Sequence, residues 1–504
     1  MRLALGVRAW VGAVVAGASL AVSCAGVSSA AEPVDGGGRQ PPQWHGCAGG
    51  DRFKGLECAT LKVPLDYAKP GGRKIDLEIS RVKAADPAER RGILLINPGG
   101  PGGHNDIHQP YYFAHGRPEV GLKPVSKAVL DRYDLIGFDP RFSGQSTPIT
   151  CGLPDDGLGV PSGKGFEADV ARSRTVAESC GKEAGWALPY ISTRNNARDM
   201  DSIRQALGAD KISYAGKSYG SYLGMVYADM FPEHTDRFEL DAVMDPSTVW
   251  YEGMLAKGPT GELKLDRFSA WAAPRNEELH LGDTPATVRK TVLDLITRLD
   301  EEPADGGTVN GDVIREVVQA FDNDAIAREI QRWSSPQPPQ PAPTAAPDEP
   351  AADAPAGEHP DNYLAVKLGT MCGDAQWPRD PAVYKKNLEE YAKKYPIAGA
   401  MVANILPCAF WPSQPSEEPV LDPSHAPGPM LLSSGLYDFA TPFAGAERAQ
   451  ELLPAGTRMI KIDTVAHVNY RTGNPCVDDP ANTFLATGKL PGKDLTCPAT
   501  ASGG

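Results

Sequence analysis

Short apolar runs alternate with stretches of helical spacing along most of this chain. The runs are bounded by Gly, Pro or Asp, and their length and composition are typical of strands that are buried on both faces. They lie at 92–97, 133–138, 212–215, 238–244, 430–434 and 457–462. Strands that alternate with helices predict a mostly parallel sheet flanked by helices. We therefore expect an α/β fold.

One earlier run has a different pattern. Over residues 75–82, apolar side chains alternate with polar ones, which predicts a strand with one face buried and the other in water. Such strands are typical of the margin of a sheet rather than its centre. We expect this strand near an edge.

The stretch 247–428 interrupts the alternation, because it is helical in pattern and has no run typical of a strand. We interpret it as a helical cap inserted into a core domain made of residues 44–246 and 429–504. Within the cap, residues 336–360 contain nine prolines among 25 residues and almost no large apolar side chain. A segment of this composition cannot bury enough surface to become ordered, so we expect a disordered loop.

The first 31 residues have the pattern of a signal peptide. Two arginines precede an Ala-rich apolar region, small residues at 28–31 offer a cleavage site, and no acidic residue occurs. The apolar run is shorter than the ~20 residues that a membrane span requires. We expect a secreted protein without a membrane span and with a flexible N-terminus at 32–43. Cys24 leaves the alternative of a lipid anchor, which would make the protein a cell-surface lipoprotein.

Composition narrows the partners and the compartment. With 64 acidic and 50 basic residues, the chain has a formal net charge of −14 and no basic cluster, which argues against nucleic acid as a main partner. Beyond Cys24, eight cysteines remain, an even number as disulfides in an exported protein require. Their scattered spacing, without a C-x-x-C pair, gives no sign of a metal site. Neighbours in sequence close the shortest loops, so we expect the pairs Cys47–Cys58, Cys151–Cys180, Cys372–Cys408 and Cys476–Cys497.

The central chemical signal is the segment Gly216-Lys217-Ser218-Tyr219-Gly220. It directly follows a strand run and directly precedes a helical pattern that Pro232 stops. A serine in a tight turn between a strand and a helix is typical of a nucleophile, and the flanking glycines avoid collisions with the neighbouring elements. Ser218 is therefore the candidate nucleophile.

A serine nucleophile needs a base and an acid that orients the base. His467 follows the last strand run and completes the chain order of serine, acid and histidine, so it is the candidate base. Asp438 follows the strand run at 430–434 and is the favoured acid. Asp463 and Asp245 remain competitors for that role.

Backbone donors for an oxyanion are predicted in the glycine-rich segment 97–103, which follows a strand run. The amide of Gly100, together with that of Tyr219, would make a two-donor oxyanion hole. A phosphate-binding loop is the alternative, but the lysine of that motif is missing and the prolines remove donors. His104 and His108 could ligate a metal if they were helical, yet no third ligand is evident. We place them at the mouth of the substrate pocket instead.

Further short motifs run through the chain. They are Trp44 with Cys47, Glu57-Cys58-Ala59, Val63-Pro64-Leu65-Asp66-Tyr67, Phe138-Asp139-Pro140-Arg141, Leu223-Gly224, Asp245-Pro246 and Thr441-Pro442. Together with the glycine-rich segment, the Ser218 turn, Asp438 and His467, they resemble the secreted tripeptidyl aminopeptidases of actinobacteria. That family is an exported branch of the α/β-hydrolase superfamily and is related to the prolyl aminopeptidases. The resemblance covers most of the mature chain and includes a TAP-like region in 429–504.

The resemblance implies an α/β-hydrolase fold in which Ser218 is the nucleophile, His467 the general base and Asp438 its orienting acid. It implies peptide substrates with a free N-terminus, and it implies no cofactor. Binding the ammonium group of such a substrate requires a carboxylate in the pocket, for which Asp374 is the candidate. A solvated aspartate at a helix end is the alternative interpretation of Asp374. The chain departs from the family pattern at His104, Phe142-Ser143 and Ala466, which reshape the edge of the pocket.

Two other functions are compatible with the same residues. An exported carboxylesterase or lipase uses the same triad, since the cap alone selects esters or peptides. A catalytically idle binding protein that keeps the hydrolase fold is the third interpretation, and the complete set of Ser218, Asp438 and His467 argues against it.

Overall fold

The computed structural model describes residues 41–103, 106–153, 165–334 and 359–499. The expected signal peptide, Cys24, His104 and positions 336–358 of the proline-rich loop lie outside these residues.

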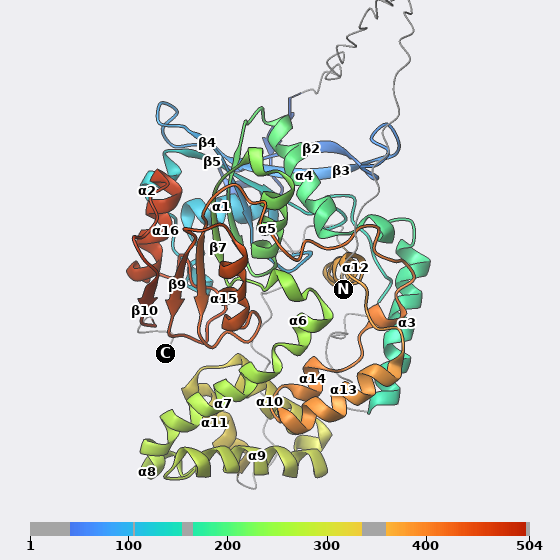
Figure 1. The fold of residues 1–504 in the computed structure, drawn as a ribbon, viewed down its shortest axis with the longest axis vertical. Helices are drawn as coiled ribbons and strands as arrows, with labels where there is room; N and C mark the ends of the chain where they lie inside the picture. Colours follow the sequence, from blue (N-terminus) through green and yellow to red (C-terminus); the bar gives the residue numbers. More distant parts are fainter. Residues whose placement is uncertain (1–40, 104–105, 154–164, 335–358, 500–504) are drawn as a thin grey trace, which may run out of the picture. The chain divides into compact units, whose positions relative to one another are not determined.

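Within the described residues, ten strands form one sheet in the order β1-β2-β3-β5-β4-β6-β7-β8-β9-β10 (Figure 1). The pairs among β1, β2, β3 and β5 are antiparallel, whereas every pair from β5 to β10 is parallel. The strands are β1 (His45–Gly46), β2 (Glu57–Pro64), β3 (Lys74–Val82), β4 (Gly92–Asn97), β5 (Tyr133–Phe138), β6 (Ile212–Lys217), β7 (Thr235–Asp241), β8 (Leu431–Gly435), β9 (Arg458–Ile462) and β10 (Leu495–Cys497).

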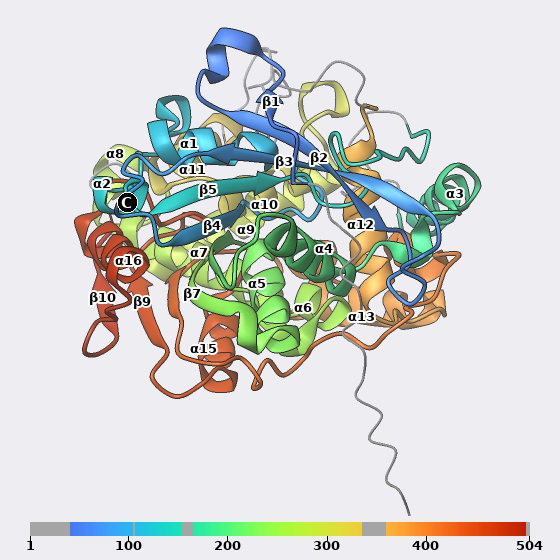
Figure 2. The same cartoon turned by 90° about the horizontal axis from the view of Figure 1, so that it is seen from above.

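Helices cover both faces of the sheet, and the central strand β4 is therefore apolar on both of its faces over Ile93–Ile96. In β4, Ile93 and Leu95 pack into one core cluster, while Leu94 and Ile96 pack into another. Successive side chains of a strand point to opposite faces, so the two clusters lie on opposite sides of the sheet. One cluster includes α4 (Thr193–Ala206), α5 (Tyr219–Met230) and α15 (Phe443–Leu452), and the other includes α1 (Gln109–His115), α2 (Lys127–Leu130) and α16 (Pro475–Thr487) (Figure 2).

The strand β3 differs from its expected setting. It is third from the edge, because β1 and β2 extend the sheet beyond it. Its polar face is covered in part, although the Asp76 side chain is 41% exposed. Glu78 is 8% exposed and accepts a hydrogen bond from Thr60 Oγ1 at 2.7 Å, and the buried Ser80 hydroxyl donates to the Ile107 carbonyl. The expectation of a wet face holds for Asp76 and was wrong for Glu78 and Ser80, because polar partners from β2 and from the 106–108 turn satisfy these two side chains.

The seventh strand ends earlier than its apolar run. β7 closes at Asp241, and Ala242 follows with a φ of 51°, which leaves the extended conformation. The apolar residues up to Met244 therefore belong to the segment beyond the strand. This shift places Asp241, rather than Asp245, at the carboxyl end of β7.

Between β7 and β8 the described residues contain helices and no strand. The helices α7, α9, α10 and α11 share an apolar core of their own, which includes Phe268, Val292, Ile314 and Ile330. By contrast, Val366 of α12 packs into the core of the sheet. The helices are α6 (Tyr251–Leu255), α7 (Gly258–Ala272), α8 (Asn276–Leu279), α9 (Pro285–Glu301), α10 (Gly311–Ala320), α11 (Asn323–Ser334), α12 (Asn362–Asp374), α13 (Pro381–Lys394) and α14 (Gly399–Val402).

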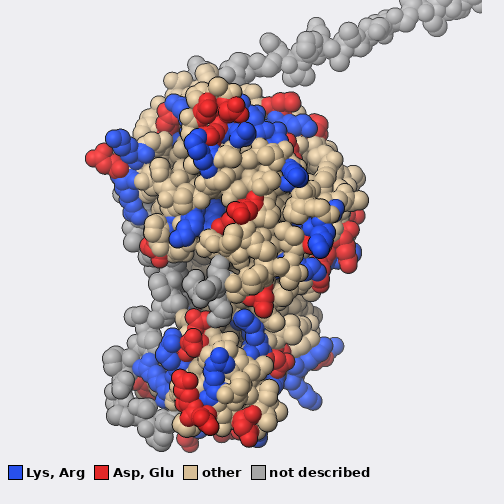
Figure 3. All heavy atoms as spheres, turned by 90° about the vertical axis from the view of Figure 1, so that its left-hand side faces the viewer, with Lys and Arg blue, Asp and Glu red and all other residues tan. Residues whose placement is uncertain are grey.

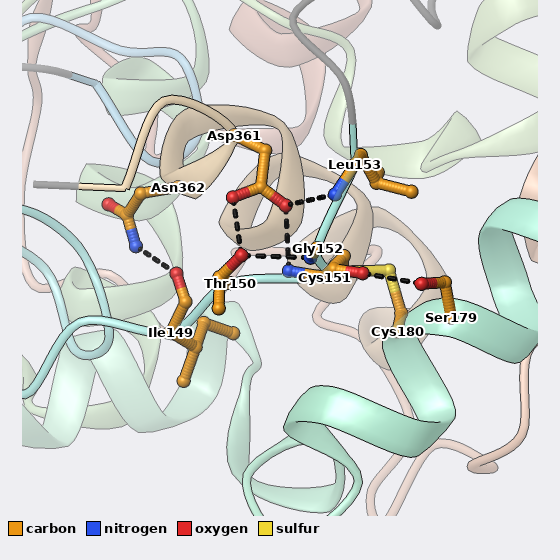
Figure 4. The surroundings of a disulfide bond; sticks show 9 residues. All are labelled: Ile149, Thr150, Cys151, Gly152, Leu153, Ser179, Cys180, Asp361 and Asn362. Atoms are coloured by element: carbon orange, nitrogen blue, oxygen red, sulfur yellow. Dashed lines mark hydrogen bonds between the residues drawn. A yellow bond between two sulfur atoms is a disulfide. The ribbon is translucent and has the colours of Figure 1, made fainter.

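Four disulfides link cysteines that are neighbours in sequence: Cys47–Cys58, Cys151–Cys180, Cys372–Cys408 and Cys476–Cys497. These are the pairs expected from the loop lengths. Figure 4 shows the second bridge, which joins the 149–153 segment to α3 (Phe166–Ala184). Beside it, Asp361 precedes α12 and accepts hydrogen bonds from the amides of Cys151 and Leu153 at 2.8 and 3.0 Å. The insertion is thus fastened to the core beside a disulfide.

The surface carries both signs of charge. On the face that Figure 3 shows, Lys and Arg side chains are interspersed with Asp and Glu. Among the described helices, none is long and apolar enough to cross a membrane.

The mostly parallel sheet, the helices on both of its faces and the serine turn after the central strand β6 are the features of the α/β-hydrolase fold. The expected fold class is confirmed.

Candidate active site

Ser218 lies in the turn between β6 and α5, with a φ of 55° and a ψ of −125°. A Cβ at position 216 would lie 2.5 Å from the carbonyl oxygen of Gly220, and one at position 220 would lie 2.6 Å from that of Asn97. Both distances are far shorter than a van der Waals contact, so glycine is required at each position. The turn therefore holds the serine in a strained conformation at the carboxyl end of β6.

The glycine-rich segment after β4 lies against this turn. A Cβ at Gly99 would lie 2.9 Å from the Ser218 Cβ and 3.4 Å from the Tyr219 nitrogen. Gly100 follows with a φ of 105°, a conformation that favours glycine. The two segments that carry the expected oxyanion donors, Gly100 and Tyr219, are thus in contact.

Asp438 and His467 form a hydrogen-bonded pair. His467 Nδ1 lies 2.7 Å from Asp438 Oδ2, and the carboxylate side chain is 1% exposed whereas the imidazole is 36% exposed. The Thr441 hydroxyl donates to the same oxygen at 2.7 Å, and the Ala440 amide donates to Oδ1 at 2.8 Å. The carboxylate is therefore fixed by its own turn, and it fixes the orientation of the imidazole.

The competing acids lie elsewhere. Asp463 is exposed, and its carboxylate lies 3.9 Å from the Arg267 guanidinium. Asp245 accepts hydrogen bonds from the amide and hydroxyl of Ser247 at 2.9 and 2.6 Å. Among the acids considered, the structure brings Asp438 alone into hydrogen-bond contact with His467.

Comparison with known proteins decides the family. A family described as "TAP-like protein" matches residues 395–497, a range that contains Asp438 and His467. A tripeptidyl aminopeptidase of Streptomyces lividans is 31% identical over 470 residues, which cover 90% of this chain and 86% of the relative. This chain belongs to the tripeptidyl aminopeptidase family. The resemblance drawn from its short motifs is confirmed.

Other relatives of this tripeptidyl aminopeptidase family member are similar over most of their length. The serine protease Hip1 of Mycobacterium tuberculosis is 28% identical over 495 residues, which cover 91% of each chain. Carboxylesterase B of Mycobacterium tuberculosis is 28% identical over 487 residues, which cover 90% of this chain and 89% of the relative. These relatives identify the chain as a serine hydrolase.

Burial and three charged groups act on the pKa of His467, the family's expected base. Burial disfavours the charged imidazole of His467, but the carboxylate of Asp438 and, beyond it, that of Asp241 favour the charged form. Lys257, at the start of α7, acts in the opposite direction. The net result is that the pKa of His467 lies above its ordinary value of 6.5.

Asp374, the predicted ammonium-binding residue, is buried at the end of α12 and already has hydrogen-bond donors within the protein. It is 5% exposed, and its carboxylate accepts hydrogen bonds from the amide and hydroxyl of Thr193, both at 2.6 Å, and from the Trp250 indole at 3.0 Å. Burial raises its pKa to about 6. This carboxylate at the end of α12 therefore ties the helix to α4 and to Trp250, and ammonium binding by Asp374 stays a prediction.

Of the two histidines considered as metal ligands, His104 lies outside the described residues. His108 is buried and stacks on Phe53, with ring centroids 4.0 Å apart. In the part of the chain that the structure describes, no group of three His, Cys, Asp or Glu side chains could hold a metal ion.

Sequence reasoning about this tripeptidyl aminopeptidase family member missed two polar residues beside the pair. One is Thr441, which donates to Asp438, and the other is Asp241, which contacts the loop that carries His467. Position at the carboxyl end of a strand was the available signal for Asp241, because polar groups at these ends meet at one edge of a parallel sheet. The sequence pattern placed the end of this strand at Met244 instead of Asp241, so Asp241 was not recognised as a residue at a strand end.

Proposed function

We propose that this protein is an exported serine aminopeptidase that releases tripeptides or other short peptides from the free N-terminus of its substrates. The observation that carries the proposal is the Asp438–His467 hydrogen bond of 2.7 Å in a chain whose serine turn and glycine segment are in contact. The family gives the class of reaction, and the printed name of the Streptomyces relative gives the type of product.

The proposed reaction is acyl transfer through Ser218. The serine Oγ attacks the scissile carbonyl carbon while His467 Nε2 takes its proton, and Asp438 stabilises the imidazolium that forms. The amides of Gly100 and Tyr219 hold the oxyanion. His467 then protonates the leaving amine, and the C–N bond breaks. A water molecule, activated by the same imidazole, hydrolyses the acyl-enzyme and regenerates the serine.

The inserted helices support a restriction to chain ends. The Arg267 guanidinium of α7 lies 4.8 Å from the ring centre of Tyr437, beside the acid, and a Cβ at Gly102 would meet the Val366 side chain of α12 at 2.8 Å. Two elements of the insertion thus contact the turn that carries Asp438 and the glycine-rich segment that lies against Ser218. We propose that they form a cap (247–428) that admits an extended peptide end and excludes the middle of a folded protein.

Export supports the same account. Four disulfides persist only in an oxidising compartment, which favours a secreted protein. The signal peptide at 1–31 and the alternative lipid anchor at Cys24 remain part of this proposal. Mass determination of the mature N-terminus distinguishes a cleaved secreted form from a lipid-modified one.

An esterase is the second candidate function, and the similarity to carboxylesterase B is the observation that favours it. The distinction lies in the substrate rather than in the triad. We would compare the wild-type enzyme with Ser218→Ala on one chromogenic tripeptide amide, with its N-terminus either free or acetylated, and on a short acyl ester.

Cleavage of the free form alone, and only by the wild type, supports the aminopeptidase. Hydrolysis of the ester with no cleavage of either amide would reassign the protein as an esterase. If the wild type does not react with a fluorophosphonate serine probe, the protein would be reassigned as a catalytically idle binding protein.

A further inference from the structure

Asp241 is placed between the two loops that carry the proposed nucleophile and base. It is the last residue of β7 and is 0% exposed. In the sheet it is paired with Lys217 of β6 on one side and with Ser433 of β8 on the other. Its carbonyl oxygen accepts a hydrogen bond of 3.0 Å from the amide of Ser218. The backbone of Asp241 is therefore in direct contact with the serine turn.

The side chain of Asp241 binds the loop that carries His467, which is called the histidine loop below. Its Oδ2 accepts the amides of Asn469 and Tyr470 at 2.8 and 3.0 Å, and its Oδ1 accepts the Asn469 side-chain amide at 3.0 Å. These residues follow His467 by two and three positions. Three hydrogen bonds thus tie Asp241 to the loop directly after the imidazole.

All the acceptor capacity of this carboxylate is used within the protein. In addition to the loop, Oδ1 accepts the Ser433 hydroxyl and the Ala242 amide, both at 2.9 Å. A carboxylate has about four lone-pair sites, so five donors leave none for a substrate. The residue cannot act on the reacting atoms, and any contribution must pass through Ser218 and His467.

We propose that Asp241 is the positioning residue that sets the serine turn and the histidine loop in register with each other. This proposal deepens the proposed function and rests on it, because it assigns the geometry of the same site. A single buried residue that binds one partner through its backbone and the other through its side chain fixes their separation, since both bonds share one Cα. Displacing the imidazole by about 1 Å costs on the order of 100-fold in rate.

Other titratable groups surround this carboxylate. Glu239 lies on the same strand, and burial raises its pKa well above its ordinary value. The charges of Asp241 and of Asp478 on α16 also raise this pKa, whereas that of Lys217 on β6 lowers it. At the imidazole, the charges that act are those of Asp438, Asp241 and Lys257. Removal of the Asp241 charge therefore lowers the pKa of His467, since that charge favours the imidazolium.

Asp478 offers a matched control. Its carboxylate accepts the amides of Arg471 and Gly473 at 2.7 and 2.8 Å, so it binds the same loop in the same way but farther from His467. It is not among the groups that shift the pKa of the imidazole. Asp478→Asn thus removes a carboxylate that holds the loop without removing the link to the serine turn.

The experiment compares wild type, Asp241→Asn, Asn469→Ala and Asp478→Asn as folded full-length mature proteins. The rate of reaction with a fluorophosphonate probe is measured first, because it needs an activated Ser218 but no peptide specificity. We expect a fall of about 100-fold for Asp241→Asn and a fall of several-fold for Asn469→Ala, with little change for Asp478→Asn. With the tripeptide amide, kcat falls and KM stays near that of the wild type. The acid limb of the kcat/KM profile moves to lower pH for Asp241→Asn only.

Three results would overturn the proposal. The first is a folded Asp241→Asn variant that reacts with the probe as fast as the wild type. The second is an Asp478→Asn variant that loses as much probe rate as Asp241→Asn. If Asp241→Asn does not fold, the third is an Asn469→Ala variant whose probe rate equals that of the wild type. If the wild type reacts with the probe but cleaves no peptide with a free N-terminus, only the aminopeptidase proposal is contradicted. The probe rates of the variants then still test the role of Asp241.

Discussion

His467 Nδ1 and Asp438 Oδ2 lie 2.7 Å apart, although 29 residues separate them in the sequence. The carboxylate is buried and also accepts a hydrogen bond from Thr441, so it cannot turn away from the imidazole. This relationship fixes which ring nitrogen faces Asp438 and which is left for the proposed nucleophile.

Asp438→Asn is expected to leave the fold intact and to lower kcat by about 10³ to 10⁴-fold, because the carboxamide favours the wrong imidazole tautomer and does not stabilise the imidazolium. Steady-state kinetics and a melting curve check this. Asp463→Asn is the control, since that side chain is 58% exposed, and it should behave as the wild type. An Asp438→Asn enzyme with near-normal kcat contradicts the assignment of the acid.

The pH profile of kcat/KM should have an acid limb with its midpoint above 6.5. His467 must be neutral to accept the serine proton, and its pKa lies above that ordinary value, so activity rises as the pH passes through the raised pKa. Lys257 opposes the charged imidazole, and burial lowers its own pKa to about 8.

Lys257→Met should therefore move the midpoint to still higher pH, and Lys290→Met, on an exposed side chain, should leave it in place. A midpoint that moves downward in Lys257→Met would show that this lysine does not act on the imidazole.

Gly216→Ala should lower both stability and activity, although it adds only one methyl group. Its Cβ would lie 2.3 Å from the Tyr214 ring and 2.5 Å from the Gly220 oxygen, so the serine turn must shift. We expect a loss of about 1 to 3 kcal/mol in the free energy of unfolding, measured in urea, together with loss of activity. Gly92→Ala meets nothing within 4 Å and is the matched control. If the two variants are equally stable, the predicted clash at Gly216 is contradicted.

Asp374→Asn separates the two interpretations of that carboxylate. Because its oxygens bind Thr193 and Trp250, we expect a loss of about 1 to 3 kcal/mol in stability, while the preference for a free over an acetylated N-terminus is unchanged. The ratio of kcat/KM values for the two substrates measures that preference. A collapse of the ratio in a stable variant would restore Asp374 as the ammonium-binding residue.

The fold was largely predictable because its central strands obey simple rules. Runs such as Gly92–Asn97 and Tyr133–Phe138 are apolar at nearly every position, since helices cover both of their faces. The polar face of β3 could not be predicted in the same way. Glu78 and Ser80 look like solvent-facing residues until their partners, Thr60 and the Ile107 carbonyl, are known.

The candidate site was predictable to the extent that its residues belong to local motifs. Ser218 is marked by its flanking glycines, and His467 by its position after the last long strand. Asp241 has no such mark, because its loop partners Asn469 and Tyr470 lie 228 and 229 residues away. The hydrogen bonds of Asp374 could not be predicted either, since Thr193 and Trp250 lie far from it in the sequence and only the fold brings them to it.

The most direct measurement of the central claim uses the purified mature enzyme and one peptide of about ten residues, supplied with a free or an acetylated N-terminus, with products identified by mass spectrometry. We predict release of the N-terminal tripeptide, or another fragment of fixed short length, from the free peptide only, and no product with Ser218→Ala. Internal cleavage of both peptides, or an intact free peptide beside rapid hydrolysis of a short acyl ester, would contradict the account.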